Sequence, residues 1–463
     1  MEGKLNSIYG DILNLQPLKM NRTKLINLGI FGSYNKASIG DSAILQGIID
    51  QFKLNLNSLT IFAFDPVDIK ATIDFNNIKG KIISRKPIPY KKEIKQIQSL
   101  QENKFIYNLK KLIKKNNILS RFIYSFYKST NLLTLAYDFQ IYYLNKKFWQ
   151  KITREIEKLD LLIIGGGNLI MDLYPNWPIH PLIYALLAKK AKVPIMLYAI
   201  GAGPINSFKA RIYFKIIGRI AHAITTRDVN SKKEVRMLGI KSGKIITSAD
   251  PALCMNFNKH NLKKEPKKDL IGINVVPYFD KRYWPNGGDE IIYTEYVKKM
   301  ALLVDEIITQ LNKQILFITT NFPNDLLVSY DVYEKSAQKE KIIIVENKLT
   351  INEILSTISQ CQIILGTRLH SLILSYKTTT PFLAFGYQPK VRSFCEEYWF
   401  NNFFVPLDKK FNFSTRSILN KLTILLNKRD EYSKKMERKL PLMKKRANVS
   451  KDIAINIISN KRS

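Results

Sequence analysis

The sequence has few cysteines and no long uninterrupted apolar run. Its three cysteines, Cys254, Cys361 and Cys395, lie far apart and form no CxxC pair. This spacing fits neither a disulfide framework nor a zinc knuckle, and it predicts reduced, mostly buried thiols in a cytosolic protein. The first twenty residues lack the charged start and apolar stretch of a signal peptide. The longest apolar runs, LLIIGGGNLIM and VPIMLYAIGAG, fall short of the roughly 18 residues of a membrane-spanning helix. We therefore expect a cytoplasmic chain that spans no membrane.

Acidic residues are scarce relative to basic ones. The chain has 38 Asp and Glu against 73 Lys and Arg, a formal net charge of +35. A field of this sign favours anionic partners, such as nucleic acid, acidic lipid, acidic glycan or phosphorylated metabolites. The lysines are dispersed, and Lys, Ile and Asn are abundant throughout, so we attribute most of the charge to an AT-rich genome. No zinc-finger spacing and no aromatic–basic sheet motif is present, so we expect no nucleic-acid partner.

Short apolar runs alternate with helical patterns along most of the chain, which predicts parallel βαβ units. With 463 residues the chain exceeds the usual size of a single core, so we expect two α/β domains. The fold class that we expect is therefore α/β, with two Rossmann-like domains facing across a cleft. The boundaries that we expect are an N-terminal extension (1–23), a first domain (24–257) with a basic, aromatic helical insertion (90–159), a linker (258–269), a second domain (270–410) and a basic helical tail (411–463).

Two segments at strand ends of the first domain are candidates for substrate binding. Gly165, Gly166, Gly167 and Asn168 follow the apolar strand LLII, and glycines at a strand-to-helix turn let backbone N–H groups approach an anion, helped by the helix dipole. A simple tight turn explains the triplet equally well. The second segment, SIGDS, contains Gly40 and Asp41; its simpler interpretation is an ordinary helix start capped by Asp41 or Ser42.

Basic side chains follow three further strands. Arg227, in TTRDVNS, can form a bidentate bond to a carboxylate or phosphate; alone, a surface pair with Asp228 is the simpler explanation. Arg368 and His370 occur in GTRLHS, and in an extended segment their side chains would share one face. A guanidinium beside an imidazole suits a substrate with an acid group and a proton to transfer, although an isolated pair of this kind is more often a core feature. Lys390, in YQPK, can pair with phosphate or can be a solvated turn residue.

Taken in order, these segments resemble one family. The series SIGDSAIL, LLIIGGGNLIMD, AIGAGPI, TTRDVNSKKEVRMLGI, TSADPAL, IGINVVPY and GTRLHSLILSYKTTTPFLAFGYQPKV is similar to the polysaccharide pyruvyl transferases, over roughly residues 25 to 395. The resemblance implies a two-domain arrangement similar to that of the GT-B glycosyltransferases, with phosphoenolpyruvate as donor. It also implies a sugar acceptor in a cell-surface polysaccharide or its lipid-linked precursor, with no metal or other cofactor. The chain departs from the family after the strand QILFITT, where members often carry a histidine and this sequence reads NFPNDLL.

The resemblance also assigns roles. His370 is the expected proton donor, because an imidazole is the side chain that is half-protonated near neutral pH. Arg368 and Arg227 are expected to hold the carboxylate and phosphate of the donor, with Lys390 and the glycine segment balancing charge on the departing phosphate. Substrate-binding positions that match the family also include Ser371, in the RLHS element.

Three further hypotheses accompany this assignment. The insertion 90–159 could bind acidic lipid and hold the enzyme peripherally at the inner face of the cell membrane, or it could simply cover the first domain. A GT-B glycosyltransferase that uses a nucleotide-sugar is one alternative function, although no acidic ribose-binding element is evident late in the second domain. A non-catalytic anion-binding partner in polysaccharide assembly is the other.

Overall fold

A computed structural model describes residues 25–34, 37–63, 79–84, 146–174, 177–257, 266–284, 287–411 and 413–462. The expected N-terminal extension and most of the expected insertion 90–159 lie outside these ranges, as does most of the linker 258–269. Contact of the insertion with an acidic membrane therefore stays a prediction. In the part of the chain that is described, no helix combines the length and apolarity that crossing a bilayer requires.

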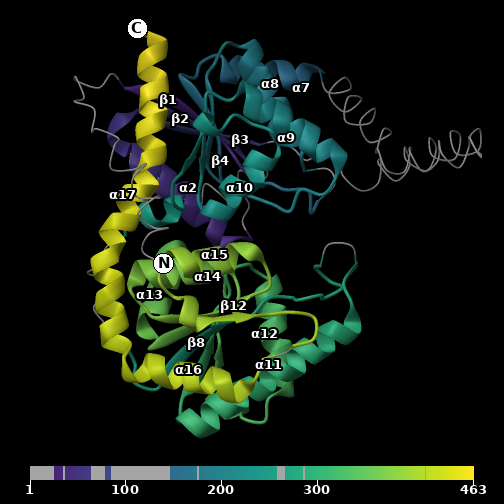
Figure 1. Ribbon diagram of the computed structural model, residues 1–463, viewed down its shortest axis with the longest axis vertical. Helices are drawn as coiled ribbons and strands as arrows, with labels where there is room; N and C mark the ends of the chain where they lie inside the picture. The colour runs from purple at the N-terminus through teal and green to yellow at the C-terminus, as the bar shows by residue number, and fades with distance from the viewer. Residues whose placement is uncertain are drawn as a thin grey trace, which may run out of the picture.

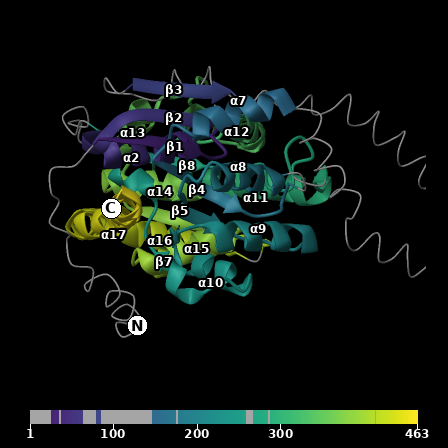
Figure 2. The same cartoon turned by 90° about the horizontal axis from the view of Figure 1, so that it is seen from above.

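The first domain is a seven-stranded parallel sheet in the order β3-β2-β1-β4-β5-β6-β7 (Figures 1 and 2). Its strands are β1 (Ile26–Phe31), β2 (Leu56–Ala63), β3 (Lys79–Ser84), β4 (Leu161–Ile170), β5 (Ile195–Ala202), β6 (Ala223–Thr226) and β7 (Ile245–Thr247). Its helices are α2 (Ile39–Phe52), α7 (Lys146–Ile156), α8 (Ile179–Lys190), α9 (Phe208–Ile220) and α10 (Val229–Met237), and a 3₁₀ turn, η3, spans Pro251–Cys254.

The second domain repeats this design with a six-stranded parallel sheet in the order β10-β9-β8-β11-β12-β13. The strands are β8 (Leu270–Asn274), β9 (Gln314–Phe317), β10 (Ile342–Ile344), β11 (Ile363–Gly366), β12 (Phe382–Gly386) and β13 (Phe404–Pro406). The helices are α11 (Glu290–Leu311), α12 (Asn324–Lys335), α13 (Ile351–Gln360), α14 (Leu369–Thr378), α15 (Pro389–Glu397), α16 (Thr415–Asn427) and α17 (Arg429–Arg462).

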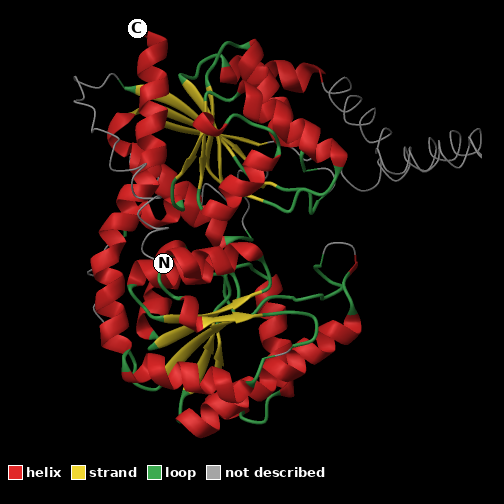
Figure 3. Cartoon of the chain, viewed as in Figure 1, coloured by secondary structure: helices red, strands yellow, loops and turns green. Residues whose placement is uncertain are grey.

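Both sheets have the doubly wound strand order of Rossmann-like domains, in which the order reverses once near the middle. The central strands are buried along nearly their whole length, as β4 and β8 show, because helices cover both faces of each sheet (Figure 3). This explains why the strands are continuous apolar runs rather than alternating ones. The expected pair of Rossmann-like domains is confirmed.

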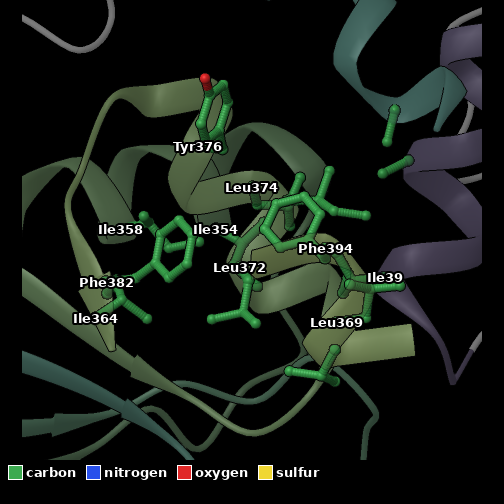
Figure 4. Close-up of a cluster of buried hydrophobic side chains, with 14 of the residues drawn as sticks. Ile39, Ile354, Ile358, Ile364, Leu369, Leu372, Leu374, Tyr376, Phe382 and Phe394 are labelled. Atoms are coloured by element: carbon green, nitrogen blue, oxygen red, sulfur yellow. The ribbon is translucent and has the colours of Figure 1, made fainter. Parts of the chain in front are cut away.

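The two domains meet where α2 of the first approaches α14 of the second. Ile39, in the first turn of α2, belongs to the same buried cluster as Leu369 and Phe394 of the second domain (Figure 4). The backbone N–H of Ile39 donates to the carbonyl of Thr320 (2.9 Å), and the N–H of Phe322 donates to the carbonyl of Ala37 (2.8 Å). The start of α2 is therefore hydrogen-bonded to the loop that follows β9, which brings the carboxyl ends of both sheets to the same junction.

The tail is helical, as expected, but it is also part of the packed structure. Helix α17 runs beside both domains (Figure 1), and its Met443 and Ala447 are fully buried. Arg446 of α17 forms a buried ion pair with Glu397 of α15, and the same carboxylate accepts a hydrogen bond from the backbone N–H of Val229 at the start of α10 (2.9 Å). Glu397 therefore connects the second domain, the first domain and the tail.

We predict that Arg446→Met destabilises the protein by about 3–5 kcal/mol, because removing one member of a buried ion pair leaves the other charge without compensation. The double variant Arg446→Met/Glu397→Gln should recover part of this loss, since it removes the unpaired charge and keeps a hydrogen-bond acceptor for Val229. Urea unfolding of the three proteins measures both effects. A single variant as stable as the wild type would show that the ion pair does not secure the tail.

Candidate functional site

A cavity of about 470 Å³ lies between the two domains, at the carboxyl ends of both sheets. In doubly wound sheets ligands bind where the strand order reverses, here between β1 and β4 in the first sheet and between β8 and β11 in the second. The loops that leave these strands supply much of the cavity wall. The expected site residues that line it are Gly40, Asp41, Gly167, Asn168, Arg227, Arg368, His370 and Lys390.

Arg227 follows β6 and is buried, so its interpretation as a surface residue is wrong. Only 5% of its area is exposed. Its Nη1 lies 3.4 Å from Asp250 Oδ2 and its Nε lies 3.5 Å from Asp228 Oδ2. Gly201 of β5 leaves the room that this side chain needs, since a Cβ there would lie 2.7 Å from Arg227 Nη2. Arg227 is thus a buried cation that two carboxylates hold at the cavity wall.

His370 lies in the first turn of α14, directly against the first turn of α2. Its Nδ1 occupies the space that a side chain at Gly40 would fill, so only a glycine permits this approach. Its Nε2 lies 3.7 Å from Asp250 Oδ2. The imidazole of the second domain is therefore seated between two elements of the first.

Asp250 is a site residue that the sequence analysis missed. It caps η3, where its side chain accepts from the backbone N–H of Ala252 (3.1 Å). Burial favours its neutral form, but His370 and Arg227 outweigh burial and hold the pKa of Asp250 below its usual value, so it remains a carboxylate. The sequence did contain a signal for this residue, an Asp-Pro pair shortly after a strand in TSADPAL. That segment is part of the family resemblance, but the resemblance assigns no role to its aspartate.

Arg368 is held by Asp325, in the segment that departs from the family. Arg368 Nε lies 2.8 and 2.9 Å from the two oxygens of Asp325, and its Nη2 lies 2.6 Å from Oδ1. Backbone N–H groups of Thr320 and Asn321 also donate to this fully buried carboxylate. Burial opposes the charged form of Arg368, yet Asp325 outweighs it and raises the pKa. Arg368 is therefore a fixed cation with one edge bound to Asp325.

Lys390 lies in the first turn of α15 and is half-buried. Burial, followed by repulsion from Arg227 and Arg368, lowers its pKa to about 7, while Asp41 and Asp228 act in the opposite direction. Burial also raises the pKa of Asp41, against the influence of His370, Ser38 and Lys390. Lys390, in the same cavity as His370, is therefore a further candidate for proton transfer.

The glycine triplet is not a strand-to-helix turn. Strand β4 continues through all three glycines to Ile170, and α8 begins only at Ile179, so the helix that follows this strand does not start at the glycines. A Cβ at Gly165 would lie 2.6 Å from the carbonyl of Tyr198. Gly166 and Gly167 have positive φ angles of 70° and 84°. Gly167 and Asn168 line the cavity, whereas Gly165 and Gly166 pack behind it.

Two smaller expectations are also corrected. Ser371 is fully buried and donates its hydroxyl to the carbonyl of Arg368 (2.6 Å), so it supports the turn before α14 and does not line the cavity. The cap of α2 is Ser38, whose hydroxyl accepts from the backbone N–H of Asp41 (3.2 Å). Asp41 is thereby in the first helical turn, where its carboxylate lines the cavity.

Aromatic side chains form a further part of the wall, and the sequence alone assigned them no role. They are Tyr174 and Trp177 from the first domain and Tyr283, Trp284 and Tyr387 from the second. The available signal was weak, because aromatic residues in loops are common. In the described ranges, no group of three or more His, Cys, Asp or Glu side chains is arranged to hold a metal ion.

Known proteins resemble this chain in sequence and in fold. Residues 39–389 match the model of the polysaccharide pyruvyl transferase family. The amylovoran biosynthesis protein AmsJ of Erwinia amylovora is 22% identical over an alignment of 379 residues, and the match covers 78% of this chain and 83% of the relative. Similar folds occur in UDP-GlcNAc 2-epimerase from Neisseria meningitidis bound to UDP-GlcNAc (TM-score 0.54, 12% identity, 94% of this chain and 99% of the other). They also occur in Anabaena Alr3699/HepE in complex with UDP-glucose (TM-score 0.54, 9% identity, 94% and 99%). The last two likenesses concern the fold alone.

We predict that Gly40→Ala costs about 1–3 kcal/mol of stability, because the added methyl group overlaps His370 and forces the imidazole out of its position. In a His370→Ala background the same change should cost close to nothing, since the obstructing ring is gone. Urea unfolding of the four proteins forms a double-mutant cycle that isolates this contact. An equal cost in both backgrounds would show that His370 does not lie against Gly40.

Proposed function

The chain belongs to the polysaccharide pyruvyl transferase family, and on that premise we propose that it transfers pyruvate from phosphoenolpyruvate to a sugar as a ketal and releases phosphate. The acceptor is a sugar of a cell-surface polysaccharide or of its lipid-linked precursor. The observation that carries this proposal is the convergence of Arg227, Arg368, Lys390 and His370 on one cavity between the domains. Three cationic groups and an imidazole suit a small donor that carries both a carboxylate and a phosphate.

The cations differ in how they can serve this donor. Arg368 is fixed by Asp325 on one edge and offers its remaining N–H groups to the carboxylate, which a guanidinium can bind through two hydrogen bonds. Arg227, held by Asp228 and Asp250, and Lys390 take the phosphate. A dianionic phosphate beside Lys390 stabilises its charged form, so donor binding returns this lysine to the ammonium state.

The reaction begins when the methylene carbon of phosphoenolpyruvate takes a proton, which leaves positive charge on the neighbouring carbon that carries the phosphate. A sugar hydroxyl attacks that carbon and loses its proton. The bond from this carbon to the phosphate oxygen then breaks and phosphate departs with the bonding electrons. A second hydroxyl of the same sugar closes the ketal and loses its proton. One proton enters the methyl group and two leave the hydroxyls, so the net proton is carried away with phosphate or solvent.

His370 supplies the first proton in this proposal. It lines the cavity, and Asp250 Oδ2 lies 3.7 Å from its Nε2, so the imidazole is next to a buried carboxylate at the wall where a general acid has to be. The cations around the phosphate stabilise the charge that develops as it leaves. Because the pKa of Lys390 is about 7, Lys390 is the second candidate for the proton donor, and the two assignments lead to different results on mutation.

We predict that His370→Ala binds phosphoenolpyruvate within a fewfold of the wild type and loses at least about a hundredfold in phosphate release, the usual contribution of a general acid. Thermal-shift titration measures donor binding, and phosphate release in the presence of acceptor glycans measures turnover. Nucleotide-sugars serve as control ligands and should not stabilise the protein. Undiminished phosphate release by His370→Ala, together with its loss in Lys390→Met, would transfer the role of acid to Lys390. Protection by nucleotide-sugars but not by phosphoenolpyruvate would overturn the proposed function.

We predict that the affinity for phosphoenolpyruvate falls as the pH rises from 7 to 9. The pKa of Lys390 is about 7 in the free protein, so the ammonium fraction declines by up to about tenfold per pH unit above that value. The phosphate of the donor is already fully ionised in this range, since its second pKa is about 6. Calorimetric titration at several pH values should show this fall in affinity in the wild type. In Lys390→Met the affinity should depend much less on pH.

Lys281→Met is the matched control for this experiment. Lys281 is exposed and pairs with Glu290 outside the cavity, and that hydrogen bond raises its pKa, so it stays charged up to pH 9. This variant should show the same dependence on pH as the wild type. If the affinity of Lys390→Met for phosphoenolpyruvate fell with pH as steeply as that of the wild type, Lys390 would not contact the donor.

A further inference from the structure

The cavity has two chemically different parts, and only one of them is used by the donor. The charged part contains Arg227, His370 and Lys390, which interact with one another through Asp41 and Asp250. The other part is the aromatic wall described above. From the half-buried Arg368 the wall leads outward through Tyr283, whose ring centre lies 5.7 Å from the guanidinium carbon, to Tyr174, which is 47% exposed. The aromatic part therefore forms the mouth of the cavity.

The two domains each contribute to this mouth. Tyr174 lies in the loop after β4, and Tyr283 and Trp284 lie in the loop after β8, so both loops leave strands at the reversal of strand order. Tyr174 and Tyr283 face the same cavity from opposite domains, and burial, followed by the influence of Tyr283, raises the pKa of Tyr174 to about 12. The phenol of Tyr174 is thus a neutral hydrogen-bonding group at neutral pH.

The loop that carries Tyr283 and Trp284 is held in place on several sides. Trp284 stacks on Phe279 with ring centres 4.7 Å apart and contacts Tyr387 at 5.8 Å. Its backbone N–H donates to the carbonyl of Asp280 (2.7 Å), and the carboxylate of Asp280 binds Arg282. A ring that is fixed before a ligand arrives loses little conformational entropy on binding, which favours a built binding surface over a simple surface cluster.

Resting on the proposed function, we propose that Tyr174, Tyr283 and Trp284 form the acceptor subsite, which takes a pyranose ring of the glycan. A pyranose has an apolar C–H face and a rim of hydroxyls, which match an aromatic face with phenolic hydroxyls at its edge. A sugar on this wall lies next to Arg368, so its hydroxyls can reach a donor bound in the charged part. The subsite places the two reactants on adjoining sections of one cavity, which is the geometry that transfer needs.

A nucleobase is the other planar ligand that could occupy an aromatic wall, and the observations favour the sugar. A nucleotide would bring a ribose that requires a hydrogen-bonding partner, commonly a carboxylate. Glu397, the buried carboxylate late in the second domain, is already bound to Val229 and Arg446. The polar atoms of Tyr174 and Tyr283 are hydroxyls, which suit the hydroxyl rim of a sugar.

Saturation-transfer difference NMR of the full-length protein tests this subsite, with and without saturating phosphoenolpyruvate. The probes are methyl β-D-galactopyranoside, methyl β-D-glucopyranoside, methyl β-D-mannopyranoside and methyl β-D-glucuronide, with uridine as the competing class. We expect saturation of the ring C–H protons of one face in at least one glycoside. Tyr174→Ala should weaken its affinity about tenfold, and Tyr174→Phe, which keeps the ring, should retain most of it.

Phe208→Ala is the matched control, because Phe208 is 59% exposed on α9 and does not line the cavity; this variant should bind the glycoside as the wild type does. Equal losses in Tyr174→Ala and Phe208→Ala would overturn the subsite, as would saturation of uridine without any glycoside.

Binding of phosphoenolpyruvate with no glycoside response would overturn the subsite and leave the proposed function standing. Glycoside binding through Tyr174 without phosphoenolpyruvate binding would support the subsite and refute the donor, and binding of neither would refute both.

Discussion

The approach of α14 to α2, with the His370 imidazole seated against Gly40, is the contact on which the candidate site depends. It joins the loops at the reversal of strand order in one sheet to those in the other. The backbone hydrogen bonds between Ile39 and Thr320 and between Phe322 and Ala37 hold the same elements together a few residues away. Because a side chain at position 40 would overlap the imidazole, this glycine determines how closely His370 approaches the first domain.

Buried carboxylates make it possible for several cations to share this confined space. Asp325 binds Arg368, and Asp228 and Asp250 flank Arg227, so each guanidinium is compensated and fixed in direction while keeping some N–H groups available. Lys390 has weaker support from acidic neighbours, and burial next to two guanidinium groups lowers its pKa to about 7. In the proposed function, a dianionic donor restores the charge on Lys390 that its protein neighbours do not fully support.

The loop after β8 and the loop after β4 give the cavity its second, aromatic character. In these loops Tyr283 contacts Arg368 on one side and Tyr174 on the other, so the polar and aromatic parts adjoin without an intervening gap. A donor that is small and strongly charged and an acceptor that is large and mostly neutral need such different surroundings. Two Rossmann-like domains provide them with little change in backbone design, because the loops at the strand ends carry the chemistry.

The sequence by itself determined the two-domain α/β fold and the elements on which the site residues lie. Continuous apolar strands followed by helical patterns have few other solutions, and the order of GGGNL, TRD and TRLHS indicated the family. Which of those residues meet in the folded chain could not be predicted in this way. Gly165, Gly166 and Ser371 match the family pattern but pack behind the cavity, because β4 continues past the glycines and α14 buries the serine. Asp250, Asp325 and the aromatic wall gave little signal, since a carboxylate or an aromatic ring acquires its role from neighbours that are up to hundreds of residues away in the chain. Burial and the proximity of charges arise only on folding, which is why the lowered pKa of Lys390 could not be predicted from its sequence context.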